Sequence, residues 1–137
     1  MEKSREELVE QFQEAFGGAI SAEPTPERLR MRRSLIEEEV KELFIEVDKA
    51  IELLEKGESV PKEIYRAMLK ELADVQVVIS GMDVALAPLY KKLSKAFLRV
   101  HTSNMTKLGK GGKPILREDG KVLKGPDYIP VDLSDLV

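Results

Sequence analysis

The sequence contains no cysteine, no tryptophan and a single histidine, His101. The absence of cysteine excludes disulfides, zinc–thiolate sites and a thiol nucleophile. A single histidine excludes sites that need two histidine ligands, such as the paired E-x-x-H sets of di-iron bundles or the H-E-x-x-H helix of zinc proteases. Aromatic residues make up 5% of the chain, which argues against aromatic stacking on single-stranded nucleic acid.

Long apolar runs are also missing, because no run approaches the 18 residues of a membrane-spanning helix. The first ten residues are charged and helix-forming, unlike a signal peptide. We therefore expect a cytoplasmic protein with no membrane partner. The length of 137 residues suits one compact domain. We predict a single domain over residues 1–137, with a helical core over about 2–103 and a Gly/Lys-rich tail over 104–137.

The net charge of −3 hides a strong asymmetry along the chain. From Ser34 to Asp83 there are 13 acidic and 6 basic residues, a local charge of −7. From Lys91 to Gly125 there are 10 basic and 2 acidic residues, a local charge of +8. This acidic middle and basic end require an explanation that composition alone does not give.

Hydrophobic periodicity predicts four helices. The first covers about residues 2–16 and stops at Gly17-Gly18, and the second runs from Pro26, with Thr25 as N-cap, to about residue 56. The third begins after Ser59, read as its N-cap. Pro88 either kinks that helix or opens a new one, and we favour a new helix over about residues 87–102.

Beyond Asn104 the pattern becomes irregular and rich in Gly and Pro. Residues 114–124 read as a β-hairpin on a type I′ turn at Asp119-Gly120. Two strands alone are marginal in water, so the hairpin needs a helix or another subunit to pack on. The predicted fold is all-α, a bundle of four to five helices with a short C-terminal β-hairpin and an irregular tail.

A repeated pattern of acids marks the second and third helices. Glu39 and Glu42 are three residues apart and flank apolar Val40, and Glu71 and Asp74 repeat this arrangement around Leu72. At about 100° per residue, each pair lies at the edge of its helix's apolar face. Two antiparallel helices packed through those faces would bring all four carboxylates together.

Such a cluster is unfavourable unless a cation compensates it, because like charges and desolvation both oppose ionisation. A hard divalent cation with oxygen ligands fits best, Mg²⁺ first, with Mn²⁺ as a substitute. Glu38 is adjacent and would serve as an outer ligand or base. The competing interpretation is that Glu37, Glu38 and Glu39 form an ordinary solvated helix face.

The basic end offers a complement to this cluster. His101, Asn104, Lys107 and Lys110 follow one another at three-residue spacing into a Gly-rich segment, which suits binding of phosphate oxygens. The alternative is a helix C-terminus whose cations offset the helix dipole. Arg32, seven residues before Glu39 on nearly the same face, either reaches a phosphate or is a surface residue.

Taken together, these residues resemble the MazG-like all-α nucleotide pyrophosphohydrolases, the superfamily of dimeric dUTPases and phosphoribosyl-ATP pyrophosphohydrolases. The family signature, E-E-x-x-E followed by E-x-x-D on the next helix, reads Glu38-Glu39-Val40-Lys41-Glu42 and Glu71-Leu72-Ala73-Asp74. The ending His101–Gly109, then Lys113-Pro114 and Arg117–Pro126, resembles the tail of a bacterial and phage subgroup. The resemblance covers most of the chain and is weakest over residues 1–25.

This resemblance implies Mg²⁺-dependent hydrolysis of a nucleoside triphosphate to the monophosphate and pyrophosphate. It implies metal binding by Glu39, Glu42, Glu71 and Asp74, with Glu38 and Glu39 as catalytic residues and Glu38 orienting or deprotonating the water. It implies nucleotide contacts by Asn104 and Lys107, and the spacing argument adds Arg32, His101 and Lys110 as candidate substrate-binding residues. It further implies a homodimer or homotetramer, and dUTP or another pyrimidine deoxynucleotide as substrate. Phe12, Gln13 and Phe16 are candidate base contacts, with core packing favoured for both phenylalanines.

Three other interpretations remain open at this stage. A helical interaction or adaptor protein without catalysis explains the amphipathic helices, but not the matched acids on two apolar faces. A basic-tailed nucleic-acid binder is disfavoured by a pI of about 5.4 and by the few aromatics, so we expect no stable nucleic-acid partner. The third alternative is the same fold acting on dCTP or on a modified purine nucleotide.

Overall fold

The structure, a computed structural model, describes residues 2–137 and is helical with almost no strand. The helices are α1 (Arg5–Ala15), α2 (Pro26–Glu55), α3 (Lys62–Ala85) and α4 (Leu93–Met105), with short 3₁₀ turns η1 (Ala87–Leu89) and η2 (Lys110–Gly112). These elements confirm the all-α prediction. Among the described residues, no helix combines the length and apolarity needed to cross a bilayer.

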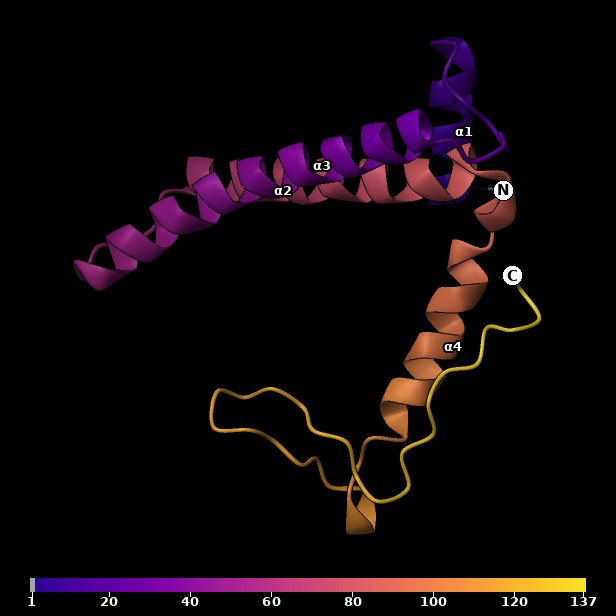
Figure 1. Cartoon of the computed structure of the whole chain (residues 1–137). Helices are drawn as coiled ribbons and strands as arrows, with labels where there is room; N and C mark the ends of the chain where they lie inside the picture. Colours follow the sequence, from indigo (N-terminus) through magenta and orange to yellow (C-terminus); the bar gives the residue numbers. More distant parts are fainter. Residues whose placement is uncertain (1) are drawn as a thin grey trace. The chain divides into compact units, whose positions relative to one another are not determined.

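The chain divides into two compact units, one ending at Lys91 and the other covering Lys92–Val137. In the first unit α2 and α3 form a long antiparallel pair, and α1 packs against α3 (Figure 1). In the second unit the C-terminal segment returns along α4 (Figure 1). The structure thus groups α4 with the tail, and the single domain over residues 1–137 stays a prediction.

The helix ends follow local chemistry. Ser4 and Thr25 accept hydrogen bonds from the backbone N–H groups of Glu7 and Arg28, both at 3.1 Å, and so cap α1 and α2. Gly17, part of the predicted stop of the first helix, takes the left-handed conformation just after α1, and Gly57 does the same just after α2.

Two predicted helix starts are wrong. Pro61, not Ser59, is the N-cap of α3, and its carbonyl accepts from the Ile64 N–H at 3.1 Å. The helix expected from Ala87 begins at Leu93. Leu86 is extended because its neighbours bond the loop at Ala22, and Lys91 at φ 55° interrupts the helical path.

The tightest core of the first unit lies where the C-terminal end of α3 meets α1 and the Ala22 loop. Val84, Ala85 and Leu86 are nearly inaccessible, and Val9 of α1 is buried with them. Leu8, Phe12 and Phe16 recur every four residues, a spacing that predicts the buried apolar stripe of this helix, but all three are exposed. The buried side of α1 carries Glu6, Val9 and Gln13. Core packing of both phenylalanines is therefore a wrong prediction for this chain.

The predicted hairpin is reduced to one antiparallel bridge, Leu116 with Val122. The Gly120 N–H bonds the Arg117 carbonyl at 2.8 Å, and Gly120 has φ 89° whereas Asp119 does not have a positive φ. A type I′ turn requires positive φ at both central residues, so that turn type is wrong. The rest of the tail is irregular, as expected.

Candidate metal and nucleotide site

The pairing of α2 with α3 brings four carboxylates together. Glu39 and Glu42 lie on one side of α2, and Glu71 and Asp74 lie on the facing side of α3. One oxygen from each residue lies within 4.8 Å of the others, so a single ion would fit among them. The antiparallel arrangement expected from the two matched E-x-x-acid segments is therefore present.

The cluster is partly buried, and this affects its charge. Glu39 Oε2 and Glu71 Oε2 are inaccessible to solvent and accept no hydrogen bond from the described residues. Burial raises the pKa of the Glu39 carboxyl, and the nearby charges of Glu42, Asp74 and Glu71 raise it further. A buried carboxylate oxygen without a hydrogen-bond donor is energetically unfavourable, and a bound cation would relieve this cost.

Among the described residues, a lysine on α3 compensates one side of the cluster. Lys70 Nζ lies 2.8 Å from Asp74 Oδ2 and 3.5 Å from Glu71 Oε1. The hydrogen bond to Asp74 raises the pKa of Lys70 above its usual range. Lys70 is not among the residues predicted from sequence, although its i,i+4 spacing to Asp74 is a recognisable helix pairing. One exposed ammonium leaves most of the negative charge of four acids unbalanced.

The donor set fits a hard divalent cation. All four groups offer oxygen, two of the oxygens are unpaired, and the negative charge exceeds that of the neighbouring lysine. Mg²⁺ prefers carboxylate oxygens together with its own waters and the phosphates of a substrate. These four residues therefore suit the Mg²⁺ ion expected from sequence.

Glu38, the expected base, is exposed on α2 beside Glu39 and is not one of the four clustered acids. Its side chain is free to meet solvent next to the cluster. Its catalytic role stays a prediction.

A pocket of about 400 Å³ begins at the cluster and extends toward α1. Glu39 lines one part, and the buried side chains of Arg32 and Gln13 line another. Phe12 and Phe16, whose ring centroids are 4.9 Å apart, contribute aromatic surface. Arg32 was expected near a phosphate, but the structure buries it and places its Nη1 3.5 Å from Gln13 Oε1.

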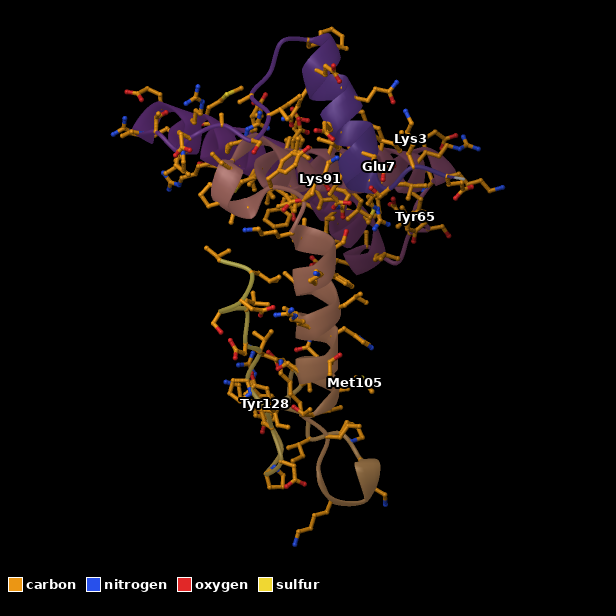
Figure 2. All side chains as sticks on the ribbon, turned by 90° about the vertical axis from the view of Figure 1, so that its right-hand side faces the viewer. Lys3, Glu7, Tyr65, Lys91, Met105 and Tyr128 are labelled. Atoms are coloured by element: carbon orange, nitrogen blue, oxygen red, sulfur yellow. The ribbon has the colours of Figure 1, made fainter. Side chains whose placement is uncertain are left out.

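The remaining expected substrate residues belong to the second unit. His101 and Asn104 are exposed on α4, Lys107 follows the helix, and Lys110 begins η2. Lys107 Nζ lies 6.0 Å from the ring centroid of Tyr128, labelled in Figure 2, and Lys124 Nζ lies 4.9 Å from the same centroid. The part of these residues in substrate binding stays a prediction.

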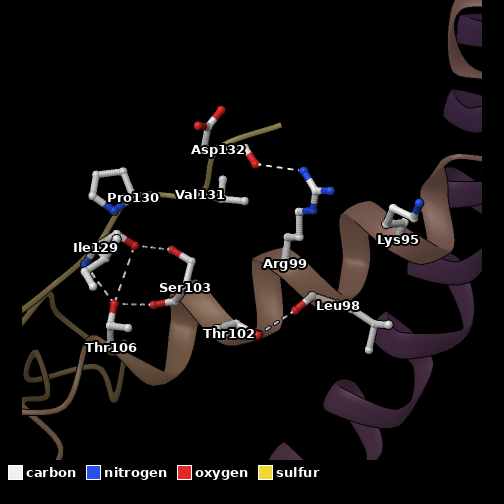
Figure 3. A pocket seen from close by; sticks show the side chains of 10 residues that line it. All are labelled: Lys95, Leu98, Arg99, Thr102, Ser103, Thr106, Ile129, Pro130, Val131 and Asp132. Atoms are coloured by element: carbon white, nitrogen blue, oxygen red, sulfur yellow. Dashed lines mark hydrogen bonds between the residues drawn. The ribbon is translucent and has the colours of Figure 1, made fainter. Parts of the chain in front are cut away.

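A second pocket of about 410 Å³ lies within this unit, between α4 and the returning C-terminal segment (Figure 3). Ser103 Oγ donates to the Ile129 carbonyl at 2.7 Å, and Arg99 donates to the Asp132 carbonyl at 3.3 Å. Arg99 also forms a bidentate pair with Asp135. These contacts hold residues 129–135 against α4.

A scan against protein-family models found no match, and a search of curated proteins found none either.

Proposed function

We propose that the protein is a Mg²⁺-dependent nucleoside triphosphate pyrophosphohydrolase. The observation that carries this proposal is the convergence of Glu39, Glu42, Glu71 and Asp74, with unpaired buried oxygens on Glu39 and Glu71. A purely structural role gives no reason to hold four acids together at the cost of desolvation. The proposal also rests on the resemblance of the two acidic segments and the tail to MazG-like enzymes.

Glu39, Glu42, Glu71 and Asp74 would hold the metal. When bound there, Mg²⁺ supplies positive charge that stabilises the negative charge developing on phosphate oxygens. Lys70 forms an ion pair with Asp74 and so offsets part of the negative charge of the cluster. The pocket beside Glu39 gives room for the nucleoside part of the substrate.

In the proposed reaction a water oxygen forms a bond to the α-phosphorus, and the bond from that phosphorus to the α,β-bridging oxygen breaks. The products are the nucleoside monophosphate and pyrophosphate. Glu38 orients the water and accepts its proton. The tail residues His101, Asn104, Lys107 and Lys110 bind the triphosphate or the sugar. dUTP or another pyrimidine deoxynucleotide is the proposed substrate, and a dimer or tetramer the proposed assembly.

The test is release of pyrophosphate from a panel of canonical and modified nucleoside triphosphates, with Mg²⁺, with Mn²⁺ and with EDTA. We expect turnover that requires the metal and falls at least about a hundredfold in Glu39→Gln, since loss of even an outer-shell partner of a metal ligand costs about 10–100-fold. Glu37→Gln is the matched control, because Glu37 is an exposed acid on α2 paired with Lys41. Unimpaired turnover in Glu39→Gln would refute the assignment of the site.

Thermal melting distinguishes this function from a non-catalytic helical adaptor. A ligand that binds the native state raises its melting temperature. We expect Mg²⁺ to raise the melting temperature of the wild type relative to EDTA and to have little effect on Glu39→Gln. An equal, small effect on both proteins would favour the adaptor.

A further inference from the structure

The pocket beside the acidic cluster is lined at one end by the buried guanidinium of Arg32. Arg32 is 7% exposed and Gln13 5%, and both line the pocket that Glu39 lines at another point. Arg32 lies seven residues before Glu39 on α2, which corresponds to about 10 Å along the helix. A flat group held beside the cluster would therefore extend toward Arg32 and Gln13.

The orientation of the Gln13 amide follows from its two partners. Gln13 Nε2 donates to the Ala19 carbonyl at 2.6 Å, and Gln13 Oε1 faces Arg32 Nη1 at 3.5 Å. The reverse orientation would turn the amide nitrogen toward a guanidinium, which has no acceptor.

Gly81 makes this contact sterically feasible. A Cβ atom at position 81 would lie 2.7 Å from Arg32 Nη1 and 2.9 Å from Gln13 Oε1. Such distances are too short, so any larger residue would displace one or both side chains. The absence of a side chain at this position of α3 therefore lets Arg32 and Gln13 meet.

The hydrogen-bonding groups of Arg32 and Gln13 that remain without a partner are mainly donors. None of the ion pairs among the described residues involves Arg32, and its contact with Gln13 uses one of five N–H groups. Gln13 keeps a second N–H. Buried donors favour a ligand that brings acceptors and oppose one that brings further donors.

We propose that Gln13 and Arg32 form a specificity-determining wall that selects a nucleobase with a carbonyl, rather than an amino group, at the edge farthest from the sugar. This inference rests on the proposed function, because it takes the phosphates to be held at the cluster. It makes uracil or thymine the favoured pyrimidine over cytosine. Arg32 acts on the base, not on the triphosphate.

The experiment measures binding rather than turnover. Isothermal titration with Mg²⁺ compares the non-hydrolysable α,β-imido analogues of dUTP and dCTP, which share sugar and phosphates and differ at the far edge of the base. We expect the dUTP analogue to bind about tenfold tighter or more, since the dCTP analogue turns an amino group toward unpaired donors. Equal affinities, tighter binding of the dCTP analogue, or binding of neither would overturn the inference.

Two variants test the residues named. Gln13→Glu replaces an amide N–H by an acceptor that pairs with Arg32, so we expect the preference for the dUTP analogue to fall to within about twofold. Gln11→Glu, an exposed position on the same helix, is the matched control and should keep the preference. Arg32→Gln should weaken the dUTP analogue more than the dCTP analogue. Equal weakening of both by Arg32→Gln would show a phosphate contact and contradict the assignment.

The binding and hydrolysis experiments test the specificity wall and the proposed activity independently. Pyrophosphate release without a preference for the carbonyl base would overturn the specificity wall and leave the proposed activity intact. A carbonyl preference in binding without release of pyrophosphate from any nucleotide would overturn the activity and leave the wall. Since the wild-type comparison needs no variant, the test does not depend on the folding of Arg32→Gln.

Discussion

At the residue scale, Glu39 is a carboxylate whose ionisation the fold opposes. Burial first, and then the charges of Glu42, Asp74 and Glu71, raise its pKa above the usual 4.5. The folded state therefore binds the Glu39 proton more tightly than the unfolded chain does. The resulting stability is present below pH 4.5 and is lost as the pH rises through the folded pKa.

We therefore expect Glu39→Gln to melt a few degrees above the wild type at pH 7 in EDTA, because Gln removes the opposed charge. The difference should shrink toward zero as the pH falls below about 4.5, where Glu39 itself is protonated. Circular dichroism melts between pH 4 and pH 7 measure this. A Glu39→Gln protein that melts lower than the wild type at pH 7 would contradict the electrostatic account.

Glu37 provides a control of opposite sign. Its hydrogen bond from Lys41 lowers the pKa of the Glu37 carboxyl, so this group stabilises the fold above its unfolded pKa and loses that effect as the pH falls. Because the pair is exposed, Glu37→Gln should change the melting temperature little, and any change at pH 7 should be a decrease.

Gly125 shows how close backbone contact restricts a position in the second unit. A Cβ at this residue would lie 2.7 Å from the Lys107 carbonyl oxygen and still closer to that of Leu108. Carbonyls of the backbone cannot rotate away as the end of a long side chain can. We expect Gly125→Ala to destabilise this unit by about 2 kcal/mol, as other overpacked positions are.

Urea denaturation together with limited proteolysis between residues 107 and 128 measures the effect of Gly125→Ala. The control is Gly18→Ala, where the nearest atoms to a new Cβ, those of Gln13, are at an ordinary 3.4 Å. Similar effects of the two substitutions would mean that the approach of Gly125 to the Leu108 backbone does not limit this position.

At the scale of elements, the two predicted N-caps have different outcomes. Thr25 is confirmed as the N-cap of α2, whereas Ser59 is wrong as the N-cap of α3. Thr25 Oγ1 accepts the Arg28 N–H at 3.1 Å, whereas α3 has no side-chain cap. We expect Thr25→Ala to lower the free energy of unfolding by about 1 kcal/mol and Ser59→Ala to have little effect. Equal losses in chemical denaturation would contradict the caps seen in the structure.

The helices that sequence predicted best are those whose limits depend on local residues. Gly17, Thr25 and Gly57 mark boundaries of α1 and α2 through backbone conformation and capping, which act over a few residues. The start of α4 was missed because it depends on distant partners. Ala22 bonds both Ala85 and Ala87, and this pairing keeps Leu86 out of the helix.

The buried face of α1 was missed for a similar reason. Leu8, Phe12 and Phe16 have the stronger apolar periodicity, yet the structure buries Glu6 and Gln13 with Val9. Glu6 accepts from the buried Ser80 hydroxyl at 3.4 Å, and Gln13 bonds Ala19 and Arg32. Polar partners supplied by α2, α3 and the following loop override a pattern that records hydrophobicity alone.

At the scale of the molecule, residue spacing in the sequence predicts the acidic cluster of the candidate site but not the pocket beside it. Each acidic pair is set by i,i+3 geometry, and the meeting of the pairs needs only antiparallel packing of α2 on α3. The pocket could not be derived in this way, since it combines Gln13 of α1, Arg32 of α2 and Gly81 of α3.

The exposure of apolar side chains bears on the assembly of the whole molecule. On α2 and α3, Phe44, Tyr65, Leu69 and Leu72 are each more than half exposed, with Leu69 at 69%. A stable protein rarely leaves so much apolar helix surface in water unless another surface covers it. Two copies related by a twofold axis would cover it with the same surface on each side.

We therefore expect the protein to sediment with at least twice the chain mass of 15.4 kDa at micromolar concentration. Leu69→Lys should shift the mass toward that of one chain, because a buried ammonium without a partner is costly at an interface. Gln11→Lys, an exposed polar position on α1, is the control and should leave the mass unchanged. A 15.4 kDa species in the wild type, with normal melting, would show that water rather than a second copy meets this surface.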